Sequence, residues 1–119
     1  MIIGLIGVSM PYIKKEQRQK LDRSIEDLSE VLESMVLADS TALAGLLNYS
    51  VSRLMARVVQ NTGGWRYHRI ASITGMLKNV SDEFYRRVAV PYENDQIDKN
   101  TDIKEYYEYD YRRKYPDAF

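Results

Sequence analysis

Residues 70–93, IASITGMLKNVSDEFYRRVAVPYE, decide the fold. Apolar residues recur there at steps of three or four, the spacing that places side chains on one face of an α-helix. The stripe consists of Ile70, Ile73, Leu77, Val80, Phe84 and Val88. Because proline lacks an amide hydrogen and disfavours helical geometry in the residue before it, Pro91 predicts that this helix ends near Val90.

Two earlier segments show the same periodicity. The first stripe is Ile25, Leu28, Leu32, Met35 and Val36, and the second is Leu43, Leu47, Val51, Leu54 and Val58. Asp22 is the predicted N-cap of the first helix, with residues 14–21 forming either a preceding turn or a continuation of the helix. Asp39-Ser40-Thr41 and Asn61-Thr62-Gly63-Gly64 are the predicted breaks after the first and second helices.

These patterns predict an all-α protein, a small bundle of about three helices with an acidic, tyrosine-rich C-terminal tail. Its predicted parts are an apolar leader at 1–9, a helical domain at 10–91 and the tail at 92–119. The leader is too short to span a membrane, which leaves a strand, a docking arm or an upstream extension. Three short helices leave apolar edges exposed, so a homo-oligomer is expected. The tail's tyrosines favour an ordered contact over disorder.

The composition excludes several kinds of functional site. The chain has no cysteine, which excludes disulfides and thiolate metal sites and suits a reducing cytoplasm. Its formal net charge is zero, which argues against non-specific binding to nucleic acid. Charge is nevertheless segregated, because residues 53–90 carry five more basic than acidic side chains and residues 92–110 carry five more acidic than basic ones.

No catalytic residue, metal ligand or cofactor motif emerges. Gly7 is followed by VSMPYIKK, which lacks the second glycine and the hydroxyl of a phosphate-binding loop. His68 is the single histidine and has no carboxylate within helical reach, and no serine lies in a Gly-x-Ser-x-Gly context. One enzyme alternative survives: Glu26-Asp27-x-x-Glu30 resembles half of the magnesium site of all-α nucleotide pyrophosphohydrolases, whose second half is absent here.

The strongest candidates for ligand binding lie near Pro91. Glu83, Arg86 and Arg87 fall at i, i+3 and i+4 of a helix, a spacing that suits ordinary ion pairs. The alternative is that the guanidinium groups, oriented by Glu83, bind a phosphate or a carboxylate. Tyr85 and Tyr92 favour this alternative, since exposed rings beside arginine can stack on a base.

A second group of candidates lies on the second helix. Tyr49 and Arg53 are four residues apart on one face, and Asn48 is a candidate for contact with a base edge or a ribose. Alternatively, Asn48 and Tyr49 satisfy a buried polar contact. Trp65 and Tyr67, in the connection to the third helix, are supporting candidates, although a tryptophan there also suits the edge of a core.

Several short motifs resemble a family of short bacteriophage proteins. They are Met10 to Ile13, Arg18 to Asp22, Leu47 to Tyr49, Glu83 to Arg87, Pro91 to Glu93 and Asn100 to Ile103. The last motif departs from the family pattern at Thr101, where glycine is expected, which weakens the prediction of a tight turn there. The resemblance covers residues 10–103 and implies a phage origin, hence the cytoplasm of an infected bacterium, but no activity.

Three functions follow as hypotheses. The first is a non-catalytic oligomer that sequesters a small anionic, nucleotide-like ligand, such as a defence signal of the host. The second is a protein-interaction module that inhibits a host or phage protein through the tail or through exposed apolar edges. The third is the magnesium-dependent pyrophosphohydrolase.

Overall fold

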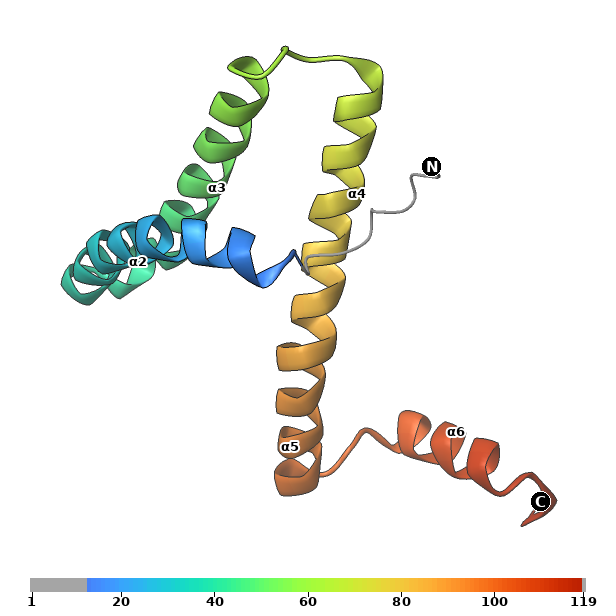
Figure 1. Cartoon of the computed structure of the whole chain (residues 1–119). Coiled ribbons are helices and arrows are strands. Elements are labelled where there is room, and N and C mark those ends of the chain that lie inside the picture. The colour runs from blue at the N-terminus through green and yellow to red at the C-terminus, as the bar shows by residue number, and fades with distance from the viewer. Residues whose placement is uncertain (1–12, 119) are drawn as a thin grey trace. The chain divides into compact units, whose positions relative to one another are not determined.

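The computed structural model describes residues 13–118 (Figure 1). The helices are α2 (Lys15–Ala38), α3 (Leu43–Gln60), α4 (Tyr67–Phe84), α5 (Val90–Asn100) and α6 (Lys104–Lys114). Shorter helical turns are η2 (Ser40–Ala42), the π-helical η3 (Tyr85–Ala89) and η4 (Pro116–Ala118). No strand occurs within residues 13–118, so the predicted all-α class is confirmed. The predicted leader at 1–9 lies outside the described residues.

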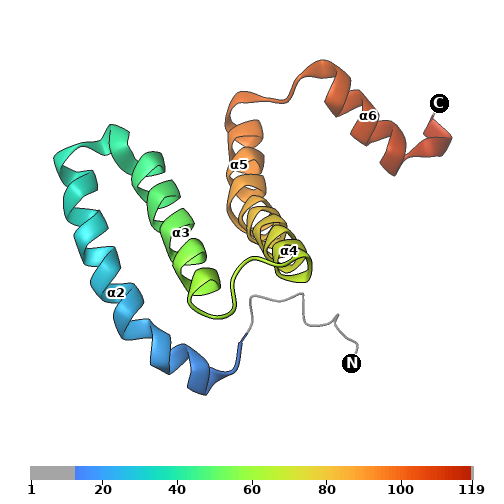
Figure 2. The same cartoon turned by 90° about the horizontal axis from the view of Figure 1, so that it is seen from above.

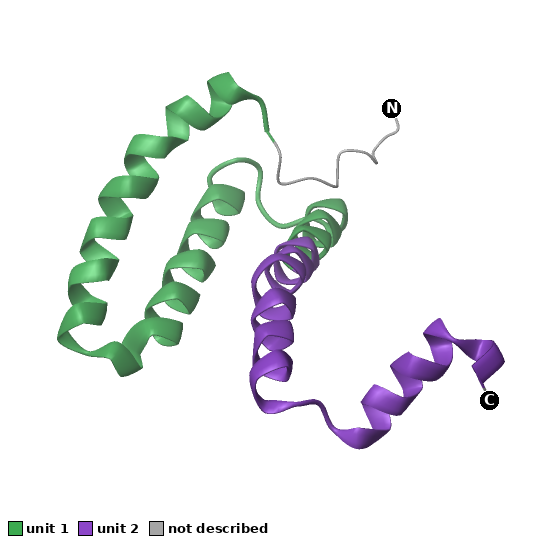
Figure 3. Cartoon of the chain, turned by 90° about the horizontal axis from the view of Figure 1, so that it is seen from below, with its two compact units in different colours: residues 1–77 green, residues 78–119 purple. Residues whose placement is uncertain are grey.

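The chain divides into two compact units, Met1–Leu77 and Lys78–Phe119 (Figure 3). The first unit contains α2, α3 and the N-terminal part of α4. The second contains the remainder of α4 with η3, α5, α6 and η4. The segmentation into 1–9, 10–91 and 92–119 stays a prediction.

Helix α2 begins earlier than the predicted cap. The Lys14 amide donates to Oε1 of Gln17 at 3.1 Å, and Nε of Arg18 donates to the Ile13 carbonyl at 3.0 Å. These bonds satisfy groups that a helix start leaves without intrahelical partners. Asp22 therefore lies inside the helix and is not its N-cap; Lys14 is the N-cap, and residues 15–21 belong to the helix.

The connection between α2 and α3 is built on Asp39, as predicted. Its carboxylate accepts from the Thr41 amide at 3.0 Å and from the Thr41 hydroxyl at 2.6 Å. These two bonds favour the ionised form and hold the pKa of Asp39 below its ordinary value of 3.8. The tight turn brings α2 and α3 side by side as an antiparallel pair (Figure 2).

The predicted break at residues 61–64 is also confirmed. Gly63 has φ of 123° and Gly64 has φ of 82°, conformations that residues with a Cβ rarely adopt. The Gly64 amide donates to the Val59 carbonyl at 2.9 Å, and the Asn61 amide donates to the Arg57 carbonyl at 3.0 Å. The two glycines therefore end α3 and let the chain turn toward α4.

Arg69, in the first turns of α4, stabilises this connection through side-chain hydrogen bonds. Its Nη1 donates to the carbonyls of Gly64 at 2.8 Å and Val59 at 3.2 Å, and its Nη2 donates to the Thr62 hydroxyl. A guanidinium supplies several donors in a fixed plane, so one side chain satisfies several loop acceptors. No periodicity or motif in the sequence indicates this role of Arg69.

The helical backbone continues through Pro91, so the prediction that it ends near Val90 is wrong. Helix α4 gives way to the π-helical turn η3, in which the Val90 amide donates to the Tyr85 carbonyl five residues earlier. Pro91 then occupies the first turn of α5. A proline is tolerated there because the first amides of a helix have no intrahelical acceptor. A π-helix is rare in proteins and occurs mostly as a single turn within an α-helix, as it does here.

The acidic, tyrosine-rich tail is helical over most of its length, as α5 and α6. Thr101 separates these helices with φ of 68°, and it is the one residue other than glycine with positive φ within residues 13–118. A turn therefore forms where the family pattern has glycine. Along α6, the ring centroids of Tyr107 and Tyr111 are 6.4 Å apart and those of Tyr111 and Tyr115 are 4.9 Å apart.

Few side chains of the described chain are shielded from solvent. Val59, which is 4% exposed, is the one buried apolar residue among residues 13–118. The apolar stripes predicted from sequence lie on helices, but most of their members are exposed: Leu28, Leu47, Leu54, Leu77 and Phe84 are 43%, 46%, 60%, 39% and 61% exposed. The apolar stripes therefore form on the helices, but within residues 13–118 most of their side chains are not covered by other parts of the chain.

Candidate functional site

The structure brings Tyr49 and Arg53 together on α3, as predicted. Nη1 of Arg53 donates to the Tyr49 hydroxyl at 3.3 Å, and the guanidinium carbon lies 5.9 Å from the centre of the ring. The hydroxyl raises the pKa of Arg53 above its ordinary value. The pair is exposed, so it presents a positive charge beside an aromatic face, which suits stacking with an anionic ring system.

Asn48 has a different partner from the one expected. Its Oδ1 accepts a hydrogen bond from the Ser52 hydroxyl at 3.2 Å, four residues further along the helix. Both Asn48 and Tyr49 are exposed, so the alternative that they satisfy a buried polar contact is wrong. Within residues 13–118, no hydrogen bond joins the Asn48 side chain to Tyr49 or Arg53.

Glu83 holds both predicted arginines. Its Oε2 accepts from Nη2 of Arg86 at 2.6 Å, and its Oε1 accepts from Nε of Arg87 at 2.8 Å. The carboxylate is half-buried, whereas the side chains of Arg86 and Arg87 are 66% and 59% exposed. The intrahelical ion pairs expected from the spacing are therefore formed, and the cluster retains one net positive charge.

The aromatic candidates are all exposed. Tyr85 lies in η3 next to the two arginines and Tyr92 lies in the first turn of α5, and they are 54% and 65% exposed. Trp65 and Tyr67 lie at the start of α4 and are 50% and 88% exposed, so Trp65 does not close a core. Exposed rings are available for stacking but are not yet arranged as a pocket.

The candidates fall into two groups. Asn48, Tyr49, Arg53, Trp65 and Tyr67 belong to the first unit. Glu83, Tyr85, Arg86, Arg87 and Tyr92 belong to the second unit. A single site that combines the two groups stays a prediction.

The carboxylates of the proposed magnesium half-site lie on α2. Asp27 accepts a hydrogen bond from Nε of Arg23 at 3.2 Å. Within residues 13–118, no group of three histidine, cysteine or acidic side chains is close enough to hold a metal ion. The described part of the chain therefore gives the pyrophosphohydrolase hypothesis no ligand set.

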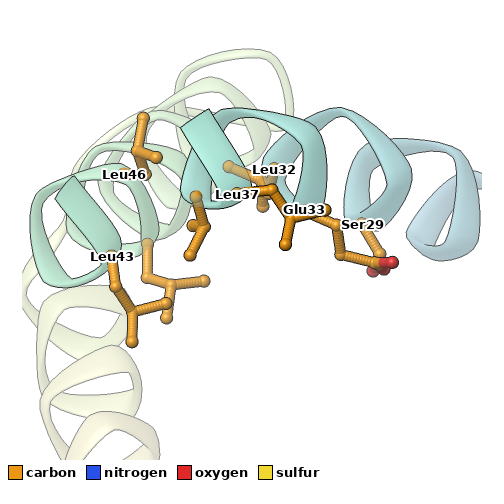
Figure 4. A pocket seen from close by; sticks show the side chains of 8 residues that line it. Ser29, Leu32, Glu33, Leu37, Leu43 and Leu46 are labelled. Atoms are coloured by element: carbon orange, nitrogen blue, oxygen red, sulfur yellow. The ribbon is translucent and has the colours of Figure 1, made fainter. Parts of the chain in front are cut away.

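An apolar hollow of about 420 Å³ lies between the end of α2 and the start of α3 (Figure 4). It is lined by Ser29, Leu32, Glu33, Val36, Leu37, Leu43, Leu46 and Leu47. The Ser29 hydroxyl donates to the Ile25 carbonyl at 2.8 Å, so the wall is effectively apolar with one carboxylate. The sequence analysis did not predict this hollow; leucines on both sides of the Asp39 turn were the available signal.

A second hollow of about 440 Å³ lies within the second unit, between α5 and α6. Tyr107, Tyr111 and Tyr115 line it together with Ile97 and polar side chains of both helices. Three of the tail's tyrosines, Tyr107, Tyr111 and Tyr115, therefore lie close to one another and line this hollow. No described helix combines the length and the apolar character needed to cross a membrane.

Comparisons with other proteins identify a family but no activity. No curated protein and no solved structure is significantly similar to the chain. A family model matches residues 10–103. The chain therefore belongs to the family described as a domain of unknown function, DUF6899.

Proposed function

We propose that this chain is a non-catalytic, phage-encoded interaction module that docks on another protein chain through its apolar helix faces. Of the functions that the sequence left open, this one agrees best with the exposure of the predicted stripes. On α3, the exposed stripe is continuous from Leu43 to Val58, whose side chains are 50% and 53% exposed.

The size of this surface carries the proposal. Isolated apolar residues on a surface are normal, but a contiguous apolar face usually marks a contact with a protein, a ligand or a membrane. Burying a half-exposed leucine contributes about 1 kcal/mol, at about 25 cal/mol per Å². Five stripe residues on α3 would therefore contribute about 5 kcal/mol, which is comparable with the lower end of the cost of association, so a specific complex also requires the apolar surface that the partner buries.

Site-specific photo-crosslinking tests this function. A benzoylphenylalanine at position 47 lies on the exposed stripe, and the same group at position 52 lies on the opposite side of α3, where Ser52 is also exposed. In the producing cells, we expect a defined protein crosslink from position 47 and not from position 52. Equal crosslinking from both positions, or none from position 47, would overturn the proposal.

A second candidate function is the sequestration of a small anionic, nucleotide-like ligand. The observation that favours it is the Tyr49–Arg53 pair, whose exposed guanidinium and ring suit a phosphate and a base respectively. Arg86 and Arg87 offer a second cationic group.

Native mass spectrometry after incubation with cyclic and linear nucleotides tests this second function. Arg53→Gln should abolish ligand retention if α3 carries the site, and the double substitution Arg86→Gln with Arg87→Gln should abolish it if η3 does. Lys99→Gln, which removes a positive charge from α5, is the matched control. If the parent protein retains no nucleotide from a broad panel, sequestration is wrong.

A further inference from the structure

The α2–α3 pair presents both a hollow and a ridge. The hollow is the leucine-lined space beside the Asp39 turn, whose wall includes Leu43 and Leu47, and the ridge is the remainder of the exposed stripe of α3, Val51, Leu54 and Val58, at 47%, 60% and 53% exposure. Figure 4 shows leucine side chains of both helices directed into the hollow. A surface that carries both shapes can pair with a copy of itself, as a two-fold symmetric contact requires.

The charges of the two helices are complementary. Residues 22–33 of α2 contain five acidic side chains and one arginine, whereas the charged residues of α3 are Arg53 and Arg57 alone. Within residues 13–118, Glu26, Glu30 and Glu33 form no ion pair, and neither do Arg53 and Arg57. These carboxylates and guanidinium groups can form ion pairs if α2 of one copy packs against α3 of another.

We infer that the occupant of this surface is a second copy of the chain, and that two α2–α3 pairs associate into a four-helix arrangement. The apolar ridge of each α3 fills the hollow of the other copy, and the arginines of α3 face the carboxylates of α2. The zero net charge of the chain adds no overall repulsion between copies. This inference rests on the proposed docking function and specifies its partner.

Charge reversal on each helix tests this pairing. One variant carries Arg53→Glu and Arg57→Glu, and the other carries Glu30→Lys and Glu33→Lys. Each variant alone places like charges across the contact, so we expect its self-association to weaken by about tenfold or more in sedimentation equilibrium. An equimolar mixture pairs acidic with basic helices again, and its association should return to within about threefold of the parent.

Leu47→Glu supplies an independent test, with Ser52→Glu as the matched control for added charge on α3. We expect the first to make the protein monomeric at micromolar concentration and the second to leave association unchanged. The helical circular dichroism of each variant verifies folding, and the charge-reversal mixture remains decisive if Leu47→Glu unfolds.

The outcomes separate this inference from the function on which it rests. A parent that stays monomeric, or variants whose mixture does not recover, would overturn the pairing of two copies. If position 47 nevertheless crosslinks selectively to a different protein, the docking function stands with another partner. If position 47 crosslinks to nothing, both fail.

Discussion

The connection between α3 and α4 and the connection between α5 and α6 both require positive φ, but they provide it differently. The first uses Gly63 and Gly64 and adds the Arg69 side chain, which binds the loop acceptors. The second uses Thr101, a β-branched residue for which φ of 68° is strained. The first connection is therefore reinforced by its own side chains, whereas the second stores strain that its sequence does not relieve.

Removing the Arg69 guanidinium should cause the largest change in the free energy of unfolding. Arg69→Met keeps the length of the side chain but loses the bonds to Val59, Gly64 and Thr62. Because the bonds to the Val59 and Gly64 carbonyls are partly buried, we expect a loss of about 2 kcal/mol in the free energy of unfolding. Urea unfolding followed by circular dichroism at one fixed protein concentration measures it.

Arg66→Met is the control for this prediction, because it removes the same charge from the same connection. Its effect should stay within about 0.5 kcal/mol, as for most exposed positions. If both variants lose the same stability, the loss reflects charge and not the bonds of Arg69.

Gly63→Ala should destabilise the first connection. Its φ of 123° is accessible to glycine, and an added Cβ would lie 3.2 Å from Nη1 of Arg69. We expect a loss of about 1 to 2 kcal/mol, because strain exceeds the entropy gained by restricting the unfolded chain. Gly75→Ala is the matched control: Gly75 lies inside α4, where an added Cβ would meet no atom within 4 Å beyond its own stretch of helix, so the variant should gain about 0.5 to 1 kcal/mol. A loss in both variants would contradict this explanation.

At the connection between α5 and α6, introducing a glycine should stabilise the protein. Thr101→Gly removes the strain of positive φ, which outweighs the entropy cost of glycine, so we expect a gain of about 1 kcal/mol. Thr101→Ala keeps a Cβ but removes the branch, and it should gain less. Hydrogen exchange of the α6 amides provides a local measurement, since slower exchange in the glycine variant alone would locate the gain at this joint.

These cases also show how far sequence reasoning reaches. The periodicity of the stripes and the glycines at 63 and 64 predicted helices and a break correctly, because both depend on a few neighbouring residues. The continuation through Pro91 depends on the π-helical turn η3. The general preference of proline for helix ends does not take such a turn into account. The role of Arg69 depends on carbonyls up to ten residues away, and periodicity does not report such contacts.

The candidate site was predictable to a similar degree. The spacing of Tyr49 with Arg53, and of Glu83 with Arg86 and Arg87, was enough to predict local pairs that the structure contains. The burial of the stripes was not predictable, because a stripe specifies which face is apolar and not what covers it. The apolar hollow beside Asp39 was missed for the same reason, since it arises between two helices.

The connection between α2 and α3 differs from the other two connections. It is stabilised by the Asp39 carboxylate and does not depend on a residue with positive φ. The Asp39 pKa is lowered, so its contribution is complete above the ordinary value of 3.8 and is lost as the pH falls through the lowered value. Asp39→Asn retains an acceptor for the Thr41 amide but does not titrate. We therefore expect the variant to be less stable than the parent at neutral pH, to lose less stability on acidification, and to approach the parent once Asp39 is protonated. Thermal unfolding from about pH 6 to about pH 2 measures the difference, and parallel pH profiles would show that Asp39 does not control this turn.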